Sequence, residues 1–276
     1  MWFVKFIPES PRWLASSGRT KEAQNTLRKI EEDNGYQKSE EIFLNTASKH
    51  STVDGKASQY GIMDLFTHRS SCIITVVMML IWCVNSMVYY GLALNVKNLG
   101  GNLYINFTLA SLIDLPSCFA AQFLLSRIGR RLSLFFLLLG GSFSCLLCML
   151  LQFQGGNNVA AVSITALGGR FCIFASFAVL YVYSAELFPT VVRNAGLGVS
   201  SLSARVGGIV APFIVLLGDR IILLPMFVFT CTALFAGLVG LTLHETQGKP
   251  MPETFEDLQR NHLRSGKNNS IRLNEL

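Results

Sequence analysis

Apolar residues dominate a long central stretch of the chain and are sparse at both ends. Between residues 71 and 243 the sequence divides into six apolar runs of 22 to 25 residues. Each run is long enough to cross the hydrocarbon core of a bilayer as a helix. The runs cover residues 71–94, 103–125, 132–153, 159–183, 194–217 and 221–243. The pattern therefore predicts an all-α membrane protein with six transmembrane helices.

The first 70 residues are polar and predict a helical arm followed by a linker. Ser10 and Pro11 form an N-cap and first-turn pair, which indicates the start of a short helix that ends at Gly18. A second helix is expected from Thr20 to about Asn34, with Gly35 as its C-terminal stop. Residues 36–60 are expected to form a linker, residues 61–68 an amphipathic lead-in to the first span, and residues 244–276 a polar tail.

Composition and charge distribution support this organisation. The chain is 51% hydrophobic and 14% charged, against about 25% charged in soluble proteins, which argues against a soluble enzyme or a nucleic-acid-binding module. If both ends lie inside, the inner segments hold 19 of the 23 Lys and Arg residues and the outer loops hold 2, Lys97 and Arg220. The positive-inside rule then predicts that both termini are cytoplasmic. The net charge of +6 is thus mainly a signal of membrane topology.

Three charged residues lie deep within the predicted spans. Asp114, Arg170 and Arg205 each stand 11 residues after the start of their runs, roughly 16 Å into the bilayer and close to its midplane. A charge at this depth costs about 2.5 to 3.5 kcal/mol, so these side chains are expected to pair or to line a watery cavity. The functional interpretation is a substrate site. The structural alternative is a buried ion-pair network that only holds the helices together.

Aromatic residues share helix faces with these charges. Arg170, Phe174, Phe177 and Tyr181 fall on one face of the fourth run, and Trp82, Asn85 and Tyr89 on one face of the first. Aromatic rings beside a cation suit an amphipathic organic ion, although such stripes also serve ordinary packing. The candidate substrate-binding residues are Arg205, Asp114, Arg170, Phe174, Phe177, Tyr181, Trp82, Asn85 and Tyr89.

The spans contain no pattern typical of an enzyme, a cofactor site or a metal site. All four His residues (50, 68, 244 and 262) lie outside the spans, so a metal site within the membrane lacks its commonest ligand. A single Asp within the spans cannot form a catalytic carboxylate dyad. We therefore expect neither catalysis nor a cofactor.

Several motifs resemble the organic cation, organic anion and carnitine transporter family of the major facilitator superfamily. They are residues 8–14 (PESPRWL), 89–92 (YYGL), 98–102 (NLGGN), 186–194 (ELFPTVVRN) and 204–209 (ARVGGI). The resemblance runs nearly end to end and implies that the six runs correspond to helices 7 to 12 of the family. Residues 1–7 would then be the end of helix 6. In this family a basic residue at the position of Arg205 is typical of anion and carnitine carriers.

A short loop predicts a conformational latch at the inner side. Residues 126–131 (SRIGRR) resemble a cytoplasmic loop motif of the superfamily, with Ser126 at the position of its usual acidic residue. Glu186 is the expected acidic partner instead. Glu186 and Arg193 with Arg130 and Arg131 are interpreted as a latch that holds one conformation of an alternating-access transporter. The alternative is a static surface ion pair that contributes little.

The resemblance implies transport of small organic ions (cations, anions or zwitterions such as carnitine) across the plasma membrane. It covers a C-terminal half only, and transporters of this class bind substrate between two six-helix halves. The partners expected are therefore the organic ion, the lipid bilayer, and either a six-helix N-terminal half or another transporter chain. A second hypothesis is a non-transporting half that associates with a full-length transporter and regulates it.

Overall fold

Two separate units make up the computed structural model of the chain, Met1–Gly61 and Ile62–Leu276. The structure describes residues 9–16, 19–35, 61–67, 69–95, 103–154, 159–218, 220–221, 223–252, 255 and 258. These residues form helices and turns and no strand, so the all-α fold class is confirmed. The predicted linker at 36–60 and most of the tail beyond residue 252 lie outside the described residues.

The first unit is a pair of short helices, α1 (Pro11–Ser16) and α2 (Thr20–Asn34). Both begin at the residues that the sequence analysis predicts, Pro11 and Thr20. The backbone N–H of Gly35 donates to the carbonyl of Glu31 from a left-handed conformation with φ 69°, which ends α2. Leu14 and Ala23 are buried, and Arg19 forms ion pairs with Glu9 and Glu22.

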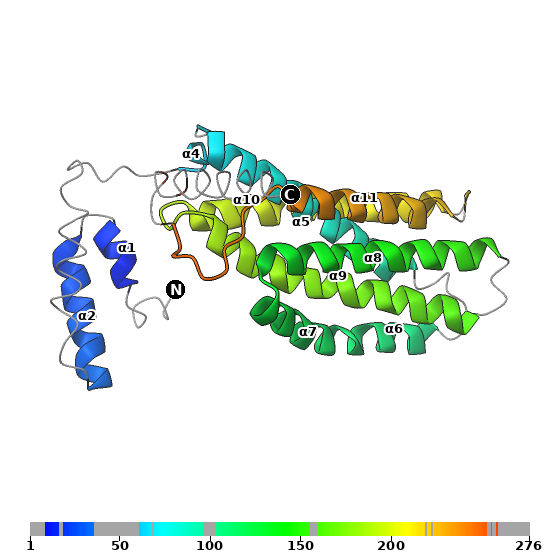
Figure 1. Cartoon of the computed structure of the whole chain (residues 1–276), viewed down its shortest axis with the longest axis horizontal. Coiled ribbons are helices and arrows are strands. Elements are labelled where there is room, and N and C mark those ends of the chain that lie inside the picture. Colours follow the sequence, from blue (N-terminus) through cyan, green and yellow to red (C-terminus); the bar gives the residue numbers. More distant parts are fainter. Residues whose placement is uncertain are drawn as a thin grey trace, which may run out of the picture. The chain divides into compact units, whose positions relative to one another are not determined.

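The second unit is a bundle of long apolar helices (Figure 1). It opens with a short helix, α4 (Asp64–Thr67), within the predicted lead-in. The helices that follow are α5 (Arg69–Asn95), α6 (Leu103–Leu112), α7 (Asp114–Arg127), α8 (Arg130–Phe153), α9 (Val159–Leu187), α10 (Arg193–Leu217) and α11 (Leu224–Gly240). They occupy the six predicted apolar runs, with α6 and α7 sharing the second.

The second run is interrupted at Ile113, directly before the candidate acid Asp114. Pro116 lacks a backbone N–H and cannot donate to the carbonyl of Leu112, four residues earlier. The neighbouring bonds persist, since Ile113 donates to Leu109 and Ser117 donates to Ile113. The break therefore lies where the missing donor of Pro116 leads us to expect it.

Among the described residues, five helices are long and apolar enough to cross a membrane by length and composition. They are the helices at Arg69–Asn95, Tyr104–Arg127, Arg130–Phe153, Ala160–Leu187 and Arg193–Leu217. The sixth, α11, is apolar but has 17 residues, about 26 Å of helix. It is shorter than the predicted run because Pro225 lies in its first turn and residues 241–243 form turns.

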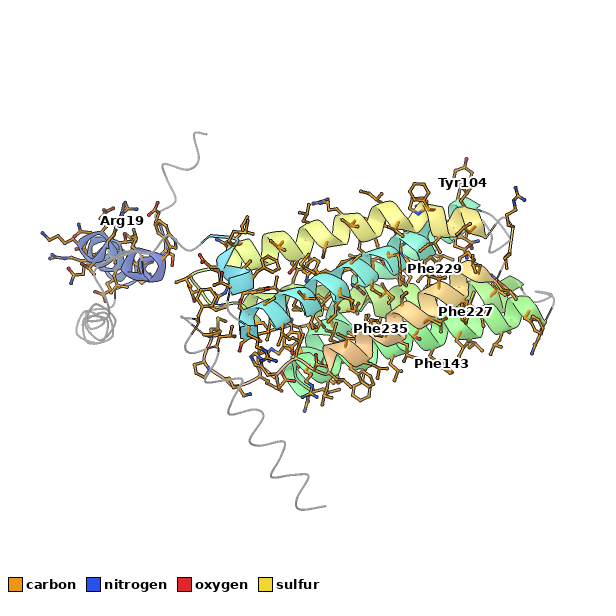
Figure 2. All side chains as sticks on the ribbon, turned by 90° about the horizontal axis from the view of Figure 1, so that it is seen from above. Arg19, Tyr104, Phe143, Phe227, Phe229 and Phe235 are labelled. Atoms are coloured by element: carbon orange, nitrogen blue, oxygen red, sulfur yellow. The ribbon has the colours of Figure 1, made fainter. Side chains whose placement is uncertain are left out.

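Many large apolar side chains face outward from the bundle. Phe143, Phe227 and Phe235 are exposed, as Figure 2 shows, whereas Phe229 is fully buried. In water such a surface would favour aggregation, but in a bilayer it contacts lipid. Together with the length of the helices, this surface identifies a multi-pass membrane protein.

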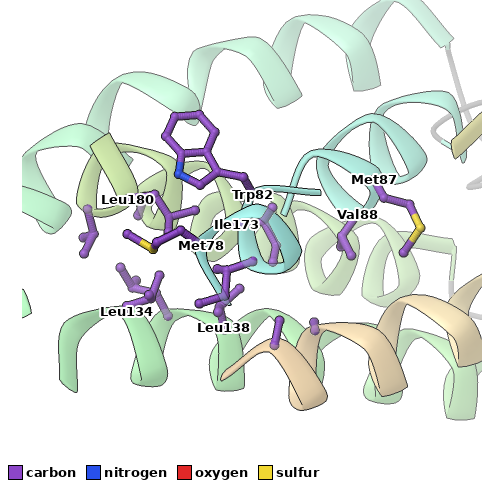
Figure 3. Packing of buried hydrophobic residues seen from close by; sticks show 14 of the residues in the cluster. Met78, Trp82, Met87, Val88, Leu134, Leu138, Ile173 and Leu180 are labelled. Atoms are coloured by element: carbon purple, nitrogen blue, oxygen red, sulfur yellow. The ribbon is translucent and has the colours of Figure 1, made fainter. Parts of the chain in front are cut away.

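The core lies where α5 and α9 pack among the other helices. Met78 and Leu180 lie toward Leu134 of α8 there, and the ring of Trp82, in the same cluster, points away from α8 (Figure 3). The crossing of α5 with α10 is especially close. A Cβ atom on Gly207 would lie 2.0 Å from the backbone oxygen of Cys83. Only glycine permits that approach, and small residues at helix interfaces in membranes serve this purpose.

Candidate functional site

Asp114 and Arg170 form an ion pair between α7 and α9. Arg170 Nη2 donates to Asp114 Oδ2 at 2.8 Å, and Arg170 Nε donates to Oδ1 at 3.2 Å. The two side chains are 15% and 8% exposed. Two parallel bonds between a guanidinium and a carboxylate make a strong, oriented pair. Two of the three mid-span charges therefore neutralise each other.

Tyr89 of α5 completes this cluster from a third helix. Its hydroxyl donates to Asp114 Oδ2 at 3.2 Å and accepts from Arg170 Nη2 at 3.0 Å. The guanidinium carbon of Arg170 lies 4.8 Å from the centre of the Tyr89 ring. The rings of Phe174 and Phe177 both lie 5.8 Å from that ring. The pair is thus satisfied internally by hydrogen bonds and a cation–π contact.

Arg205 is placed differently from Arg170. It is an exposed residue of α10, and no hydrogen bond or ion pair of its guanidinium is found within the described part of the chain. It lines a groove of about 380 Å³ between α5, α9 and α10. The residues around this groove are Trp82, Ser86, Tyr90, Phe177, Tyr181, Ser201, Ala204, Arg205, Gly208 and Ile209.

Aromatic rings form one wall of the groove. The rings of Trp82 and Tyr181 pack edge to face with their centres 4.6 Å apart, and the centre of the Phe177 ring lies 6.1 Å from that of Trp82. The indole of Trp82 is held by a hydrogen bond of 3.0 Å from Nε1 to Ser184 Oγ. The groove therefore presents ring faces, hydroxyl groups and one guanidinium. That combination can bind an organic ion that carries both a carboxylate and an apolar part.

Asn85 and Phe174 do not line the groove. Asn85 is fully buried and connects α5 to α9, because it donates to the Ile173 carbonyl and accepts a 2.5 Å bond from Ser176 Oγ. Phe174 packs against Tyr89. The structure thus divides the predicted candidates into the groove, the internal ion pair, and residues that support the two.

The candidate latch residues gather at the C-terminal end of α9. Arg130 Nη2 and Nε donate to Glu186 Oε1 at 2.8 and 3.1 Å, and the side chains are 23% and 13% exposed. Among the described residues, Arg193 donates to the Phe188 carbonyl and to Thr190 Oγ1. The buried Nε of Arg131 has no hydrogen-bond partner there. The structure therefore pairs Glu186 with Arg130 among the three basic candidates.

The segment after α11 supplies contacts that the sequence analysis missed. Glu245 accepts from the backbone N–H groups of Arg130 and Arg131, each at 3.0 Å, and so caps the start of α8. Thr246 Oγ1 donates to the second carboxylate oxygen of Glu186 at 2.5 Å. Capping residues are normally expected just before the helix that they cap. Glu245 is more than a hundred residues from the start of α8, so no local sequence pattern could have identified it as a cap.

Among the described residues, no group of three or more His, Cys, Asp or Glu residues could hold a metal ion. All seven cysteines are free.

Comparisons with known proteins agree with this architecture. The family described as "Sugar (and other) transporter" matches residues 1–258. Solute carrier family 22 member 15 of Xenopus tropicalis is 40% identical over 258 residues, which are 92% of this chain and 47% of the relative. An organic cation transporter protein of Drosophila melanogaster is 39% identical, over 91% of this chain and 46% of its own. The human organic cation/carnitine transporter 2 is 34% identical, over 94% of this chain and 46% of its own length.

A solved structure shows the same fold. The proton:xylose symporter of the major facilitator superfamily, bound to a bromodeoxyglucose, superposes with a TM-score of 0.68 at 20% identity. The match covers 94% of this chain and 55% of the symporter. The chain thus spans about half the length of the relatives it matches, and these relatives are transporters rather than enzymes. The chain belongs to the sugar (and other) transporter family, and its relatives include solute carrier family 22 member 15 and organic cation and carnitine transporters.

Proposed function

We propose that the helical unit forms one side of a transport pathway for small organic ions, and that the groove beside Arg205 binds the substrate. One observation carries the proposal. Arg205 opens into an aromatic groove without an ion-pair partner in the described residues, whereas Arg170 is neutralised by Asp114. An unpaired charge at this depth is costly, so a ligand that neutralises it gains binding energy.

The preferred substrates are carboxylates and zwitterions, such as carnitine-like molecules, over simple cations. A guanidinium stays charged and can bond a carboxylate through two parallel donors. The rings of Trp82, Phe177 and Tyr181 can contact the apolar part of the ion or a quaternary ammonium group. The names of the relatives, organic cation and carnitine transporters, support small organic ions as the class.

Alternating access is the proposed mechanism, and the pair of Arg130 and Glu186 is its proposed inner latch. The substrate of such a transporter lies between two six-helix halves. The partner of this unit is therefore a second half, on the same polypeptide or on another chain. The charge bias of the loops supports cytoplasmic termini. The plasma membrane is proposed from the resemblance to the organic ion transporter family alone.

Uptake measurements test the proposal. The full chain is produced in cells alone and together with the N-terminal half of human organic cation/carnitine transporter 2. Uptake of carnitine, a dicarboxylate and a small organic cation is then compared at equal surface expression. Arg205→Ala should lower carboxylate uptake about tenfold or more, as the loss of a charged hydrogen-bonded contact implies, and cation uptake much less. Arg220→Ala, an exposed arginine outside the groove, is the matched control.

Binding to the purified chain tests the groove without a second half. Trp82 is the only tryptophan of the helical unit, so replacing Trp2 and Trp13 by Phe leaves a single reporter beside Arg205. Carnitine should change its fluorescence, and Arg205→Ala should abolish the change. Equal responses of both proteins would make Arg205 a packing residue. Absent transport together with altered uptake by a co-expressed full-length transporter would instead favour the regulatory half.

A further inference from the structure

A second hollow lies at the C-terminal end of α9, beside the candidate latch. It has a volume of about 230 Å³ and is lined by Arg130, Glu186, His244, Thr246, Lys249 and residues next to them. This hollow, which we call the inner pocket, is formed by the starts and ends of helices together with the segment after α11. It is distinct from the groove, with which it shares no lining residue.

The segment that closes the inner pocket is firmly attached to the helices. Tyr183 donates to the carbonyl of His244 at 2.7 Å, and the backbone N–H of Thr190 donates to the carbonyl of Pro252 at 3.1 Å. Glu245 binds the start of α8. These hydrogen bonds fix the segment at residues 244–252, which forms one side of the pocket.

Among the described residues that line this pocket or bind its lining, basic side chains outnumber acidic ones. They are Arg130, Arg131 and Lys249 against Glu186 and Glu245. Arg193 reaches the pocket wall through a contact of 3.7 Å to Met251 Sδ. The local field therefore attracts anions.

Both glutamates are already occupied by donors of the protein. Glu186 accepts from Arg130 through one oxygen and from Thr246 through the other. Glu245 accepts from the backbone N–H groups of residues 130, 131, 246 and 247. Lys249 has no ion pair within the described residues, and the Nε of Arg131 is buried without a partner. Lys249, which lines the pocket, therefore remains available to a ligand.

We propose that the inner pocket binds a phosphate monoester, with Lys249 as a direct contact. The volume exceeds that of several water molecules, each about 30 Å³, and so admits a phosphate group with part of its alcohol. Two sources offer this chemistry at the end of a membrane span, a phosphoinositide headgroup and a soluble phosphate ester. Basic pockets at the ends of membrane helices suit such headgroups.

Binding to the full chain in nanodiscs tests the proposal. Phosphatidylcholine discs with and without phosphatidylinositol bisphosphate are compared by native mass spectrometry. Soluble inositol trisphosphate is added to the discs that lack the phosphoinositide. Lys249→Gln should weaken binding about tenfold, as loss of one charge-assisted contact implies, while Lys249→Arg should retain it. Arg220→Gln, at the far end of α10, removes the same charge elsewhere.

Each outcome is informative. Binding of the lipid alone identifies a headgroup site, and equal binding of inositol trisphosphate identifies a site for soluble esters. Equal weakening by Lys249→Gln and Arg220→Gln would mean nonspecific attraction to the charged surface and would overturn the proposal. The proposal would also be overturned if the wild-type chain bound neither ligand while showing the thermal unfolding transition of a folded protein.

Discussion

Two arginines at the same predicted depth have opposite surroundings. Arg170 is enclosed by a carboxylate, a phenol hydroxyl and aromatic rings, whereas Arg205 opens into the groove. Burying a charge without a partner is costly, but a bidentate pair with further hydrogen bonds recovers much of that cost. At the residue scale, the pair of Asp114 and Arg170 is therefore expected to hold three helices together, while Arg205 remains available to a ligand.

Asp114→Asn should destabilise the unit strongly, because it leaves the Arg170 guanidinium buried and unpaired. Removal of one partner from a buried pair costs about 3–5 kcal/mol. The double variant Asp114→Asn with Arg170→Gln should lose less than the sum of the two single variants. Thermal unfolding of the purified chain in detergent measures this cycle. Additive losses would show that the two side chains do not interact.

At the element scale, the contact between α5 and α10 sets the position of the groove. Gly207 brings α10 against the backbone of Cys83, and Ser203 Oγ donates to the carbonyl of Met79 at 2.7 Å. Arg205 lies between these two contacts in sequence and is carried by the same turn of helix. The close approach therefore fixes the arginine relative to the aromatic wall on α5 and α9.

Gly207→Ala should lower stability by about 1–3 kcal/mol, because the added methyl group would collide with a backbone atom that cannot move aside. Gly198→Ala is the matched control on the same helix, since no atom lies within 4 Å of the place that its added methyl group would take. That control should be neutral or stabilising by up to about 1 kcal/mol. Melting temperatures in detergent distinguish the two variants. Equal melting temperatures would contradict the close crossing.

At the scale of the whole molecule, the inner end of the bundle joins three parts of the chain. The start of α8, the end of α9 and the segment after α11 meet through Arg130, Glu186, Glu245 and Thr246. An ion pair that is partly buried and shared among separate elements can hold one arrangement of those elements and release it in another. The proposed latch is thus an assembly of three segments.

Glu186→Gln should weaken the latch and change the accessibility of the groove. The amide removes the ion pair with Arg130 but keeps an acceptor for Thr246. A cysteine at Ser201, in the groove, is labelled with a membrane-impermeant maleimide in cells that also contain the second half. The labelling rate should change severalfold, as a shift of about 1 kcal/mol implies. Glu32→Gln, in an exposed pair with Arg28, should have no effect.

Both termini should face the cytoplasm. The expectation follows from the excess of Lys and Arg in the inner segments and does not depend on the substrate. Epitope tags at each end are stained in intact and in permeabilised cells. Staining of either tag in intact cells would reverse the proposed orientation and place the inner pocket outside.

Local patterns were sufficient to predict that the helices exist and where some of them end. The start of α1 at Pro11 and the left-handed Gly35 after α2 follow from the preferences of Pro and Gly. The second run was predicted as one helix, and its division before Asp114 was not predicted. The lengths of the apolar runs follow from the thickness of the bilayer, because every transmembrane helix has to cross the same hydrocarbon core. The length of α11 was predicted less well, because its ends are decided by Pro225 and by turns that hydropathy does not register.

The sequence by itself determined the family, the membrane class and the residues with unusual charge, because each depends on short motifs or on a residue's position within its own span. Only the tertiary structure decided which arginine Asp114 neutralises, and that Glu245 caps a helix 115 residues away. Both depend on how helices rotate and pack against one another. Packing is a property of residues distant in sequence, so local patterns cannot choose among the possible partners.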